Sequence, residues 1–302
     1  MRGRTLAQFW IVTLIWGSTW LIIKSQLETV PSTWSVAYRF LAAGALMLGY
    51  CAVAGKPLRL SRQGHLFALA MAVAQFVGNF NLVYLAETHV TSGLVAVAFA
   101  LLVVPNSLFA WAFLGQRLTL RFALGSLMGM AGVAMLFQHE LAIAEFSGGV
   151  LTGLGLTLCA ILCASTANVL QATDLARAQP PFASLGVAFL YGGLLDAALA
   201  FATAGSPVID TSLTYLGGLA FLAIIASAVA FLLYFDVIRA IGPAKAAYSS
   251  LVTPFIALGL STMFEGYRWT PFAVAGAALA VGGMWVALTS RQTDEGELTG
   301  GA

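Results

Sequence analysis

The sequence predicts an all-α integral membrane protein with ten transmembrane helices, arranged as two inverted five-helix repeats. Three observations predict this fold. Of the 302 residues, 60% are hydrophobic and 9% are charged, and the mean hydropathy is +0.91, which is far more apolar than a soluble protein of this length. The apolar residues form long segments of the length needed to cross a bilayer. One unit of apolar helix, loop and apolar helix also occurs in both halves of the chain.

The repeated unit runs from position 84 to 135 and begins again at position 234. Pro105 matches Pro254, and Gln116 matches Glu265, eleven residues further on in each copy. Small residues follow at the same internal spacing, where Gly125, Gly129 and Gly132 match Gly276, Ala280 and Gly283. Halves that each cross a membrane an odd number of times lie in it with opposite orientations, which is a known way to build a transporter.

Breaks at glycine, proline and charged residues divide the chain into ten apolar segments. Each is close to the roughly 20 residues that cross about 30 Å of hydrocarbon. The first follows Arg2 and Arg4 and is longer than the apolar region of a signal peptide, so we interpret it as a retained span. The segments are 6–23, 34–54, 65–84, 92–113 and 122–137 in the first half, and 148–170, 183–202, 215–235, 244–264 and 271–290 in the second. They predict repeats at 1–145 and 146–291 and a disordered cytoplasmic tail at 292–302.

Lysine and arginine residues indicate the orientation, because they are enriched in cytoplasmic loops. With the N-terminus inside, the outer ends hold only Lys24, Arg39 and Arg268. The inner loops hold the other eleven: Arg2, Arg4, Lys56, Arg59, Arg62, Arg117, Arg121, Arg177, Arg239, Lys245 and Arg291. We therefore expect a multi-pass protein of the cell inner membrane with both termini in the cytoplasm. The turn at Gln116 is then cytoplasmic, and its counterpart at Glu265 is outside.

Composition and motifs argue against other classes. Transmembrane strands need polar residues at alternate positions, which these segments lack, and the positive charges form no patch for nucleic acid. The three cysteines are too few for a disulfide framework, and Cys159 and Cys163 are interpreted as packing residues. An intramembrane enzyme is a remote alternative, because His65, His89 and His139 fall in or beside predicted loops and no catalytic motif occurs. We expect no enzymatic activity, cofactor or metal site.

Several short motifs, taken together with the repeat, match a known family. Trp16, Gly17 and Ser18 precede Lys24 in the first span, Arg39 lies near the start of the second, and Pro105 lies in the fourth. The turn after the fourth span begins with Gln116, where the family usually has Glu, and its counterpart begins with Glu265. With these motifs the chain resembles the drug/metabolite transporter superfamily over nearly its whole length, in particular the EamA-type ten-span members.

The resemblance implies a transporter, most often an exporter of amino acids or related small metabolites. The tryptophan- and tyrosine-rich spans resemble the branch that exports aromatic amino acids. An importer or exchanger, and a multidrug-type exporter of small organic cations or other metabolites, remain alternatives. A passive channel fits less well, since large aromatic residues favour an occluding site over a polar ring. We expect a small-molecule substrate, a lipid bilayer around the protein, and either a monomer or a homodimer.

A solute site in such a protein lies near the midplane, between the halves. Polar residues that share a helix face are the candidates, although interhelical hydrogen bonds worth about 0.6 kcal/mol each explain many such residues. Gln75 and Asn79, four residues apart, share a face, and their amides both donate and accept. Ser165, Asn168 and Gln171 recur at three-residue spacing on one face of the sixth span. They lie towards its cytoplasmic end, where a gate is as well supported as a binding site. The candidate substrate-binding residues are Trp16, Trp20, Gln75, Asn79, Tyr84, Asn168, Tyr191, Ser227, Tyr234, Tyr248 and Ser250.

Prolines and charges within the spans suggest two further roles. Pro105 and Pro254 each remove a backbone donor at equivalent places in the two halves, so they predict either hinges or static kinks. Arg39 and Asp196 fall in the outer parts of the second span of each half. We expect them to pair with each other, or Arg39 to meet Glu28 or Glu87 at the outer mouth, with substrate contact as the alternative. No carboxylate lies plainly at the midplane, so a uniporter, an exchanger and a proton-driven antiporter all remain open.

Overall fold

The computed structural model describes residues 3–26, 29–90, 95, 98–136, 148–264 and 269–289, and nearly all of them are helical. The first half contains α1 (Gly3–Gln26), α2 (Ser32–Val53), α3 (Arg62–Met71), η1 (Ala72–Asn79), α4 (Phe80–Glu87), η2 (Ala100–Leu102), α6 (Val103–Leu114) and α7 (Leu120–Leu136). The second half contains α9 (Gly148–Gln171), α10 (Asp174–Arg177), α11 (Pro181–Ala204), α12 (Leu213–Ala223), η3 (Ile224–Val229), α13 (Ala230–Ile241), α14 (Pro243–Ala246), α15 (Tyr248–Phe264) and α16 (Pro271–Leu288).

These elements form the ten predicted spans, since α3, η1 and α4 are one continuous helix and α12, η3 and α13 are another. Six of the described helices are long and apolar enough to cross a membrane, and two shorter apolar helices, Ala100–Leu114 and Leu120–Met135, accompany them. The largest difference from prediction is the eighth span, which continues to Ile241. It ends there because Gly242 has a φ of 82° and Pro243 follows, a combination that stops a helix.

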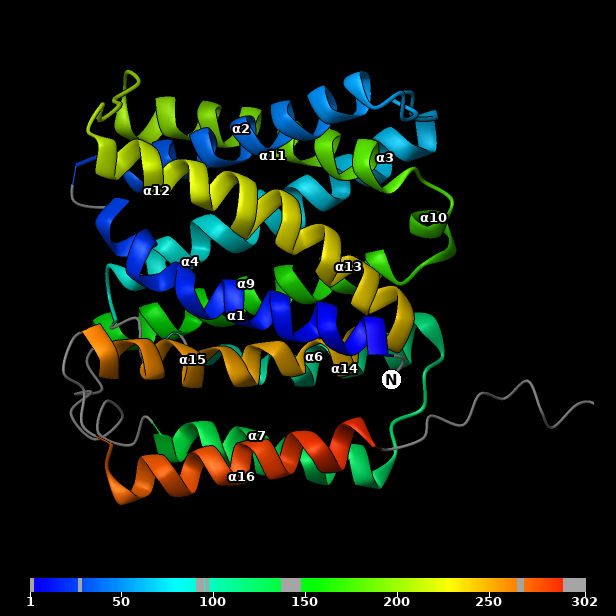
Figure 1. Cartoon of the computed structure of the whole chain (residues 1–302), viewed down its shortest axis with the longest axis vertical. Coiled ribbons are helices and arrows are strands. Elements are labelled where there is room, and N and C mark those ends of the chain that lie inside the picture. The colour runs from blue at the N-terminus through cyan, green and yellow to red at the C-terminus, as the bar shows by residue number, and fades with distance from the viewer. Residues whose placement is uncertain are drawn as a thin grey trace, which may run out of the picture.

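The two halves pack as inverted copies of each other (Figure 1). The second spans, α2 and α11, pair at one end of the long axis, and the fifth spans, α7 and α16, pair at the other. Between them, the first span of each half contacts the third and fourth spans of the other half. Thus α1 packs against α13 and α15, whereas α9 packs against η1, α4 and α6. These contacts correspond between the two halves, as an inverted repeat requires.

Small residues allow the fifth spans to approach closely. A Cβ atom placed on Gly132 would lie 2.5 Å from the carbonyl oxygen of Gly276 and from the amide nitrogen of Ala280. A Cβ on Gly125 would lie 2.6 Å from the carbonyl oxygen of Gly283. In lipid, helices associate through such backbone contacts because the hydrophobic effect does not drive them together. The glycine faces of α7 and α16 are thus used within the chain.

The third span of each half contains a π-helical segment, η1 or η3, at about the same depth. π-Helical turns are rare, and they displace backbone carbonyls from the regular ladder. Here such carbonyls accept side-chain hydrogen bonds. Val77 O accepts from Asn81 Nδ2 at 2.9 Å in η1, and Ala226 O accepts from Trp16 Nε1 at 3.1 Å in η3. The prediction placed irregular backbone at the prolines, and the structure adds these two irregular segments.

Candidate functional site

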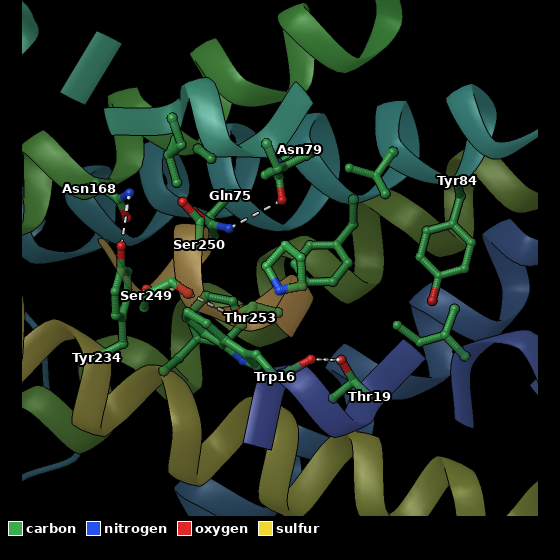
Figure 2. Close-up of a pocket in the computed structure, with 18 of the residues that line it drawn as sticks. Trp16, Thr19, Gln75, Asn79, Tyr84, Asn168, Tyr234, Ser249, Ser250 and Thr253 are labelled. Atoms are coloured by element: carbon green, nitrogen blue, oxygen red, sulfur yellow. Dashed lines mark hydrogen bonds between the residues drawn. The ribbon is translucent and has the colours of Figure 1, made fainter. Parts of the chain in front are cut away.

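A cavity of about 170 Å³ lies between the two halves, at the centre of the bundle (Figure 2). It is bounded by α1, α2, the η1–α4 helix and the fourth span from the first half, and by α9, α13 and α15 from the second. For comparison, an engineered apolar cavity of about 150 Å³ binds benzene. The described lining of the cavity in this protein consists of Trp16, Thr19, Ile23, Arg39, Gln75, Asn79, Phe80, Val83, Tyr84, Glu87, Phe99, Leu102, Ala164, Asn168, Phe231, Tyr234, Ser249, Ser250, Thr253 and Pro254.

Arg39 is the positive charge in the lining, and it is 3% exposed. Its Nε donates to Ser227 Oγ at 2.8 Å, and its Nη2 lies 3.5 Å from Ala226 O, so the π-helical segment η3 holds the guanidinium. Its central carbon lies 4.9 Å from the centroid of the Phe80 ring. Nη1 is buried and has no hydrogen-bond partner among the described residues. A buried guanidinium with a free donor is suited to bind a carboxylate.

Aromatic rings form one wall of the cavity. The Trp16 ring lies 5.2 Å from the Phe231 ring and 4.8 Å from the Tyr234 ring, both in edge-to-face geometry. The hydrogen bond from Trp16 Nε1 to Ala226 O fixes the indole, and Asn168 Nδ2 donates to Tyr234 Oη at 3.4 Å. This wall presents ordered apolar faces to a solute, suited to a flat side chain and to an ammonium group.

Amides and hydroxyls line other parts of the cavity. Gln75 Nε2 donates to Asn79 Oδ1 at 3.4 Å (Figure 2), and Asn79 Nδ2 donates to Ala160 O on α9 at 3.0 Å. On α15, Ser250 Oγ donates to the carbonyl oxygen of Ala247, just before the helix, and Thr253 Oγ1 donates to that of Ser249 within it. These side chains are held in place by their neighbours, so they can accept or exchange hydrogen bonds with a bound solute.

Glu87, the last residue of α4, lies at the end of the cavity away from the N-terminus. Its Oε1 is buried without a hydrogen-bond partner in the described part of the chain. Tyr84 lies one turn earlier, and its hydroxyl makes a side-chain hydrogen bond with the Arg39 guanidinium and interacts electrostatically with Glu87. The cavity thus contains a cationic and an anionic side chain, each with a free polar atom.

Hydrogen bonds connect the two halves at the N-terminal end of the bundle. Gln8 Nε2 on α1 donates to Asp236 Oδ2 on α13 at 3.2 Å. Asn106 Nδ2 on α6 donates to Pro243 O at 3.0 Å. The described lining of the cavity includes no residue of α1 before Trp16. The halves are therefore cross-linked by polar contacts between the cavity and this end.

The structure brings most of the predicted substrate-binding residues into this one cavity. Trp16, Gln75, Asn79, Tyr84, Asn168, Tyr234 and Ser250 line it, as do Arg39, Glu87 and Pro254. Trp20 has a side chain outside the described part of the structure. Pro105, in the first turn of α6, is not among the described lining residues, whereas Pro254 lies inside α15. Both prolines remain hinge hypotheses.

Three of the predicted substrate-binding residues lie elsewhere. Ser227 is fully buried behind the cavity and holds Arg39. Tyr248 is also fully buried, and its hydroxyl lies 2.7 Å from Ser126 Oγ on α7. Tyr191 faces a separate groove, where its hydroxyl lies 2.8 Å from His65 Nδ1. The hydroxyl groups of Ser227 and Tyr248 thus form hydrogen bonds between helices.

Arg39 and Asp196, expected as partners, are held by different groups. Asp196 is fully buried, and Asn81 Nδ2 donates to its Oδ1 at 2.6 Å. Arg39 bonds Ser227, as described above, in place of Asp196 or Glu87. Glu28, the third expected partner, lies outside the described residues. Arg39 and Asp196 thus each belong to a polar pair where the sequence suggested an ion pair.

We expect the Asn81–Asp196 contact to stabilise the fold. An Asn81→Ala variant would leave a buried carboxyl group without its donor, and should lower the free energy of unfolding by about 1–3 kcal/mol. Denaturant unfolding in detergent micelles measures this change. Thr203→Ala, which removes a hydroxyl from an exposed position of α11, is the matched control and should change stability by less than about 0.5 kcal/mol. Equal effects of the two variants would contradict this role.

Several lining residues were not among the predicted site residues. Thr19, Ile23, Phe80, Val83, Phe99, Leu102 and Ala164 are apolar or weakly polar residues of the kind that also pack between helices or face lipid. One signal was available, because Trp16, Thr19 and Ile23 recur at helical spacing on one face of α1.

Comparisons with known proteins agree with this architecture. The family model described as "EamA-like transporter family" matches residues 5–138 and again residues 151–289. The "Uncharacterized inner membrane transporter YedA" of Escherichia coli is 29% identical over 261 residues, which cover 84% of this chain and 80% of that protein. "Protein PagO" of Salmonella typhimurium is 27% identical over 132 residues, which are 44% of this chain and 43% of PagO, less than half of either.

More distant comparisons cover nearly the whole chain. The "Uncharacterized transporter YvbV" of Bacillus subtilis is 21% identical over 281 residues, or 93% of this chain and 90% of that protein. One crystal structure superposes with a TM-score of 0.78 over 95% of this chain and 97% of that chain at 19% identity, which shows a shared fold. Because the family model matches both halves, the chain belongs to the EamA-like transporter family.

Proposed function

We propose that this transporter exports amino acids with aromatic or other apolar side chains, or closely related small metabolites, across the cell inner membrane. The observation that carries the proposal is the pairing of free charges in one aromatic cavity. Arg39 Nη1 and Glu87 Oε1 lack hydrogen-bond partners among the described residues, and both side chains line the cavity. An amino acid carries one carboxylate and one ammonium group, which complement these two side chains.

The remaining walls select the side chain of the substrate. Trp16, Phe231 and Tyr234 offer ring faces and edges, which favour a flat apolar group over a charged one. The cavity of about 170 Å³ suits a molecule of amino-acid size. A multidrug-type exporter of organic cations is disfavoured, because a cation without a carboxylate would lie beside the buried and uncompensated charge of Arg39.

In the proposed mechanism, the two halves rock around the central cavity, and both termini are cytoplasmic. We assign the contacts Gln8–Asp236 and Asn106–Pro243, at the N-terminal end of the bundle, to a cytoplasmic gate that is closed in this state. Breaking them and forming contacts near Glu87 would expose the same cavity to the other side. The protein then moves a solute without a catalytic step, and we assign it no enzymatic role. An importer or exchanger would use the same cavity, so direction must be measured.

Transport by purified protein in liposomes tests the proposal. We expect uptake of labelled tryptophan, phenylalanine or leucine, and much slower uptake of the amine and of the deaminated acid that share the same side chain. Both analogues lose one of the two charged contacts, and each such hydrogen bond is worth about 1.5–3 kcal/mol. Transport of the amine as fast as the amino acid would favour the cation exporter, and transport of none of the three would remove the amino-acid assignment.

Glu87→Gln tests the proposed ammonium contact separately. The variant keeps the size and polarity of the side chain and loses its charge. We expect the preference for the amino acid over the deaminated acid to fall by about 10-fold or more, because only the amino acid uses the carboxylate. Competition of each unlabelled compound with the labelled substrate measures this ratio. Asp174→Asn, the same loss of charge at an exposed residue of α10 that is absent from the described lining, is the control. An unchanged ratio in Glu87→Gln would contradict the contact.

A further inference from the structure

A second cavity lies on the side of the bundle, between α3 and α11. It is a groove of about 390 Å³ that shares no described lining residue with the central cavity. Its described lining consists of Arg62, His65, Leu66, Leu69, Tyr191, Leu194 and Leu195. The transport cycle proposed above does not use these residues. Their arrangement therefore calls for a separate explanation.

One part of this groove is polar and positively charged. Arg62, the first residue of α3, is exposed there, and His65 lies one turn further into the helix. His65 Nδ1 and Tyr191 Oη lie 2.8 Å apart, so the ring and the phenol are held together. Lys56 and Arg59 belong to the connection that leads into α3. The described lining contains no acidic residue, so this part of the groove is complementary to an anion.

The other part of the groove is apolar and open. Leu66 and Leu194 are each 59% exposed, and Leu69 and Leu195 are 41% and 40% exposed. The four leucines lie on two helices that are each long and apolar enough to cross the bilayer. Within the membrane these four leucines need an apolar molecule to cover them, and the acyl chain of a lipid meets this need.

We propose that this groove binds one anionic phospholipid, from the leaflet on the N-terminal side of the protein. The phosphate group lies at Arg62, where His65 and the hydroxyl of Tyr191 add hydrogen bonds, and an acyl chain lies along the four leucines. A phosphatidylcholine headgroup brings its own cation close to Arg62, Lys56 and Arg59, so it binds less well. Basic grooves between helices on the cytoplasmic side are typical lipid headgroup sites.

Native mass spectrometry of the purified protein tests this site without any transport assay. The protein is incubated with equal amounts of phosphatidylglycerol and phosphatidylcholine that have identical acyl chains. We expect phosphatidylglycerol adducts to dominate in the wild type, and the ratio of the two adducts to fall about fivefold in Arg62→Gln, as expected for one basic residue near the membrane surface. Tyr191→Phe, which keeps the ring, should lower the ratio to a smaller extent.

Arg121→Gln is the matched control, because Arg121 is exposed at the start of α7 and is absent from the described lining of the groove. Its adduct ratio should equal that of the wild type. A wild type that binds both lipids equally would overturn the proposal. An equal fall in Arg121→Gln and Arg62→Gln would also overturn it, since it would show a general effect of charge. The proposal would also be overturned if the protein without lipid were a dimer that dissociates in Leu194→Glu. That result would show that a second copy of the chain occupies the groove.

Discussion

An Arg39→Gln variant is expected to bind the transported amino acid about 10- to 100-fold more weakly than the wild type, the largest functional effect that we anticipate. A hydrogen bond to a charged group contributes about 1.5–3 kcal/mol, and the glutamine amide cannot replace the guanidinium charge. The free Nη1 atom of Arg39 is the donor that the substrate carboxylate would use. The effect should be much smaller for an amine that has the same side chain, because the amine makes no contact with Arg39.

Equilibrium binding of a labelled amino acid to the purified variant measures this effect. Ser227→Ala should weaken binding less, because it removes only the group that positions Arg39, at 2.8 Å from Nε. Arg59→Gln, in the connection before α3, is the control and should bind normally. A thermal unfolding curve close to that of the wild type shows that Arg39→Gln is folded. Normal binding by the folded variant would show that Arg39 has a structural role only.

The largest effect on stability is expected at Gly132. A methyl group on Gly132 would lie 2.5 Å from backbone atoms of α16, which have no rotamer with which to move away. We expect Gly132→Ala to lower the free energy of unfolding by about 1–3 kcal/mol, and Gly132→Val to lower it further. The helices α7 and α16 would have to separate. They are the fifth spans of the two inverted halves, so the change would weaken a contact between the halves.

Gly282→Ala, on α16 itself, is the matched control. A Cβ atom at Gly282 meets no atom within 4 Å, so this change should be neutral or stabilising by up to about 1 kcal/mol, the helix propensity difference. Unfolding in detergent by denaturant compares the two variants directly. If both glycines tolerate alanine equally well, the close approach of α7 and α16 is not as described.

The spans could be predicted from sequence because their cause is local. A helix in lipid needs an unbroken apolar segment, and glycine, proline and charge mark its ends. The π-helical segments η1 and η3 could not be predicted in this way. Their displaced carbonyls are satisfied by Asn81 and Trp16, and in the case of Trp16 the donor comes from the other half of the chain. Such long-range partners leave no mark on the local sequence.

The candidate site shows the same division between local and long-range causes. Gln75 and Asn79 could be placed together because residues four apart share a helix face. The sequence does not say which neighbour that face meets. For this reason Tyr191 and Tyr248 were both expected at the substrate site. Tyr191 instead lies in the groove between α3 and α11, and the hydroxyl of Tyr248 lies beside Ser126. Arg39 was expected mainly as half of an ion pair, since its contact with Ser227 depends on the fold of η3.

The central claim is that the solute occupies the cavity between the two inverted halves. Protection of a single introduced cysteine from a small thiol reagent tests it most directly. Val83→Cys places the thiol in the lining, in a background where Cys51, Cys159 and Cys163 are alanine. Leu213→Cys, at a position that is 90% exposed, is the control outside the cavity. We predict that a saturating transported amino acid slows the reaction at position 83 and leaves that at 213 unchanged; equal rates at position 83 with and without the amino acid would contradict the account.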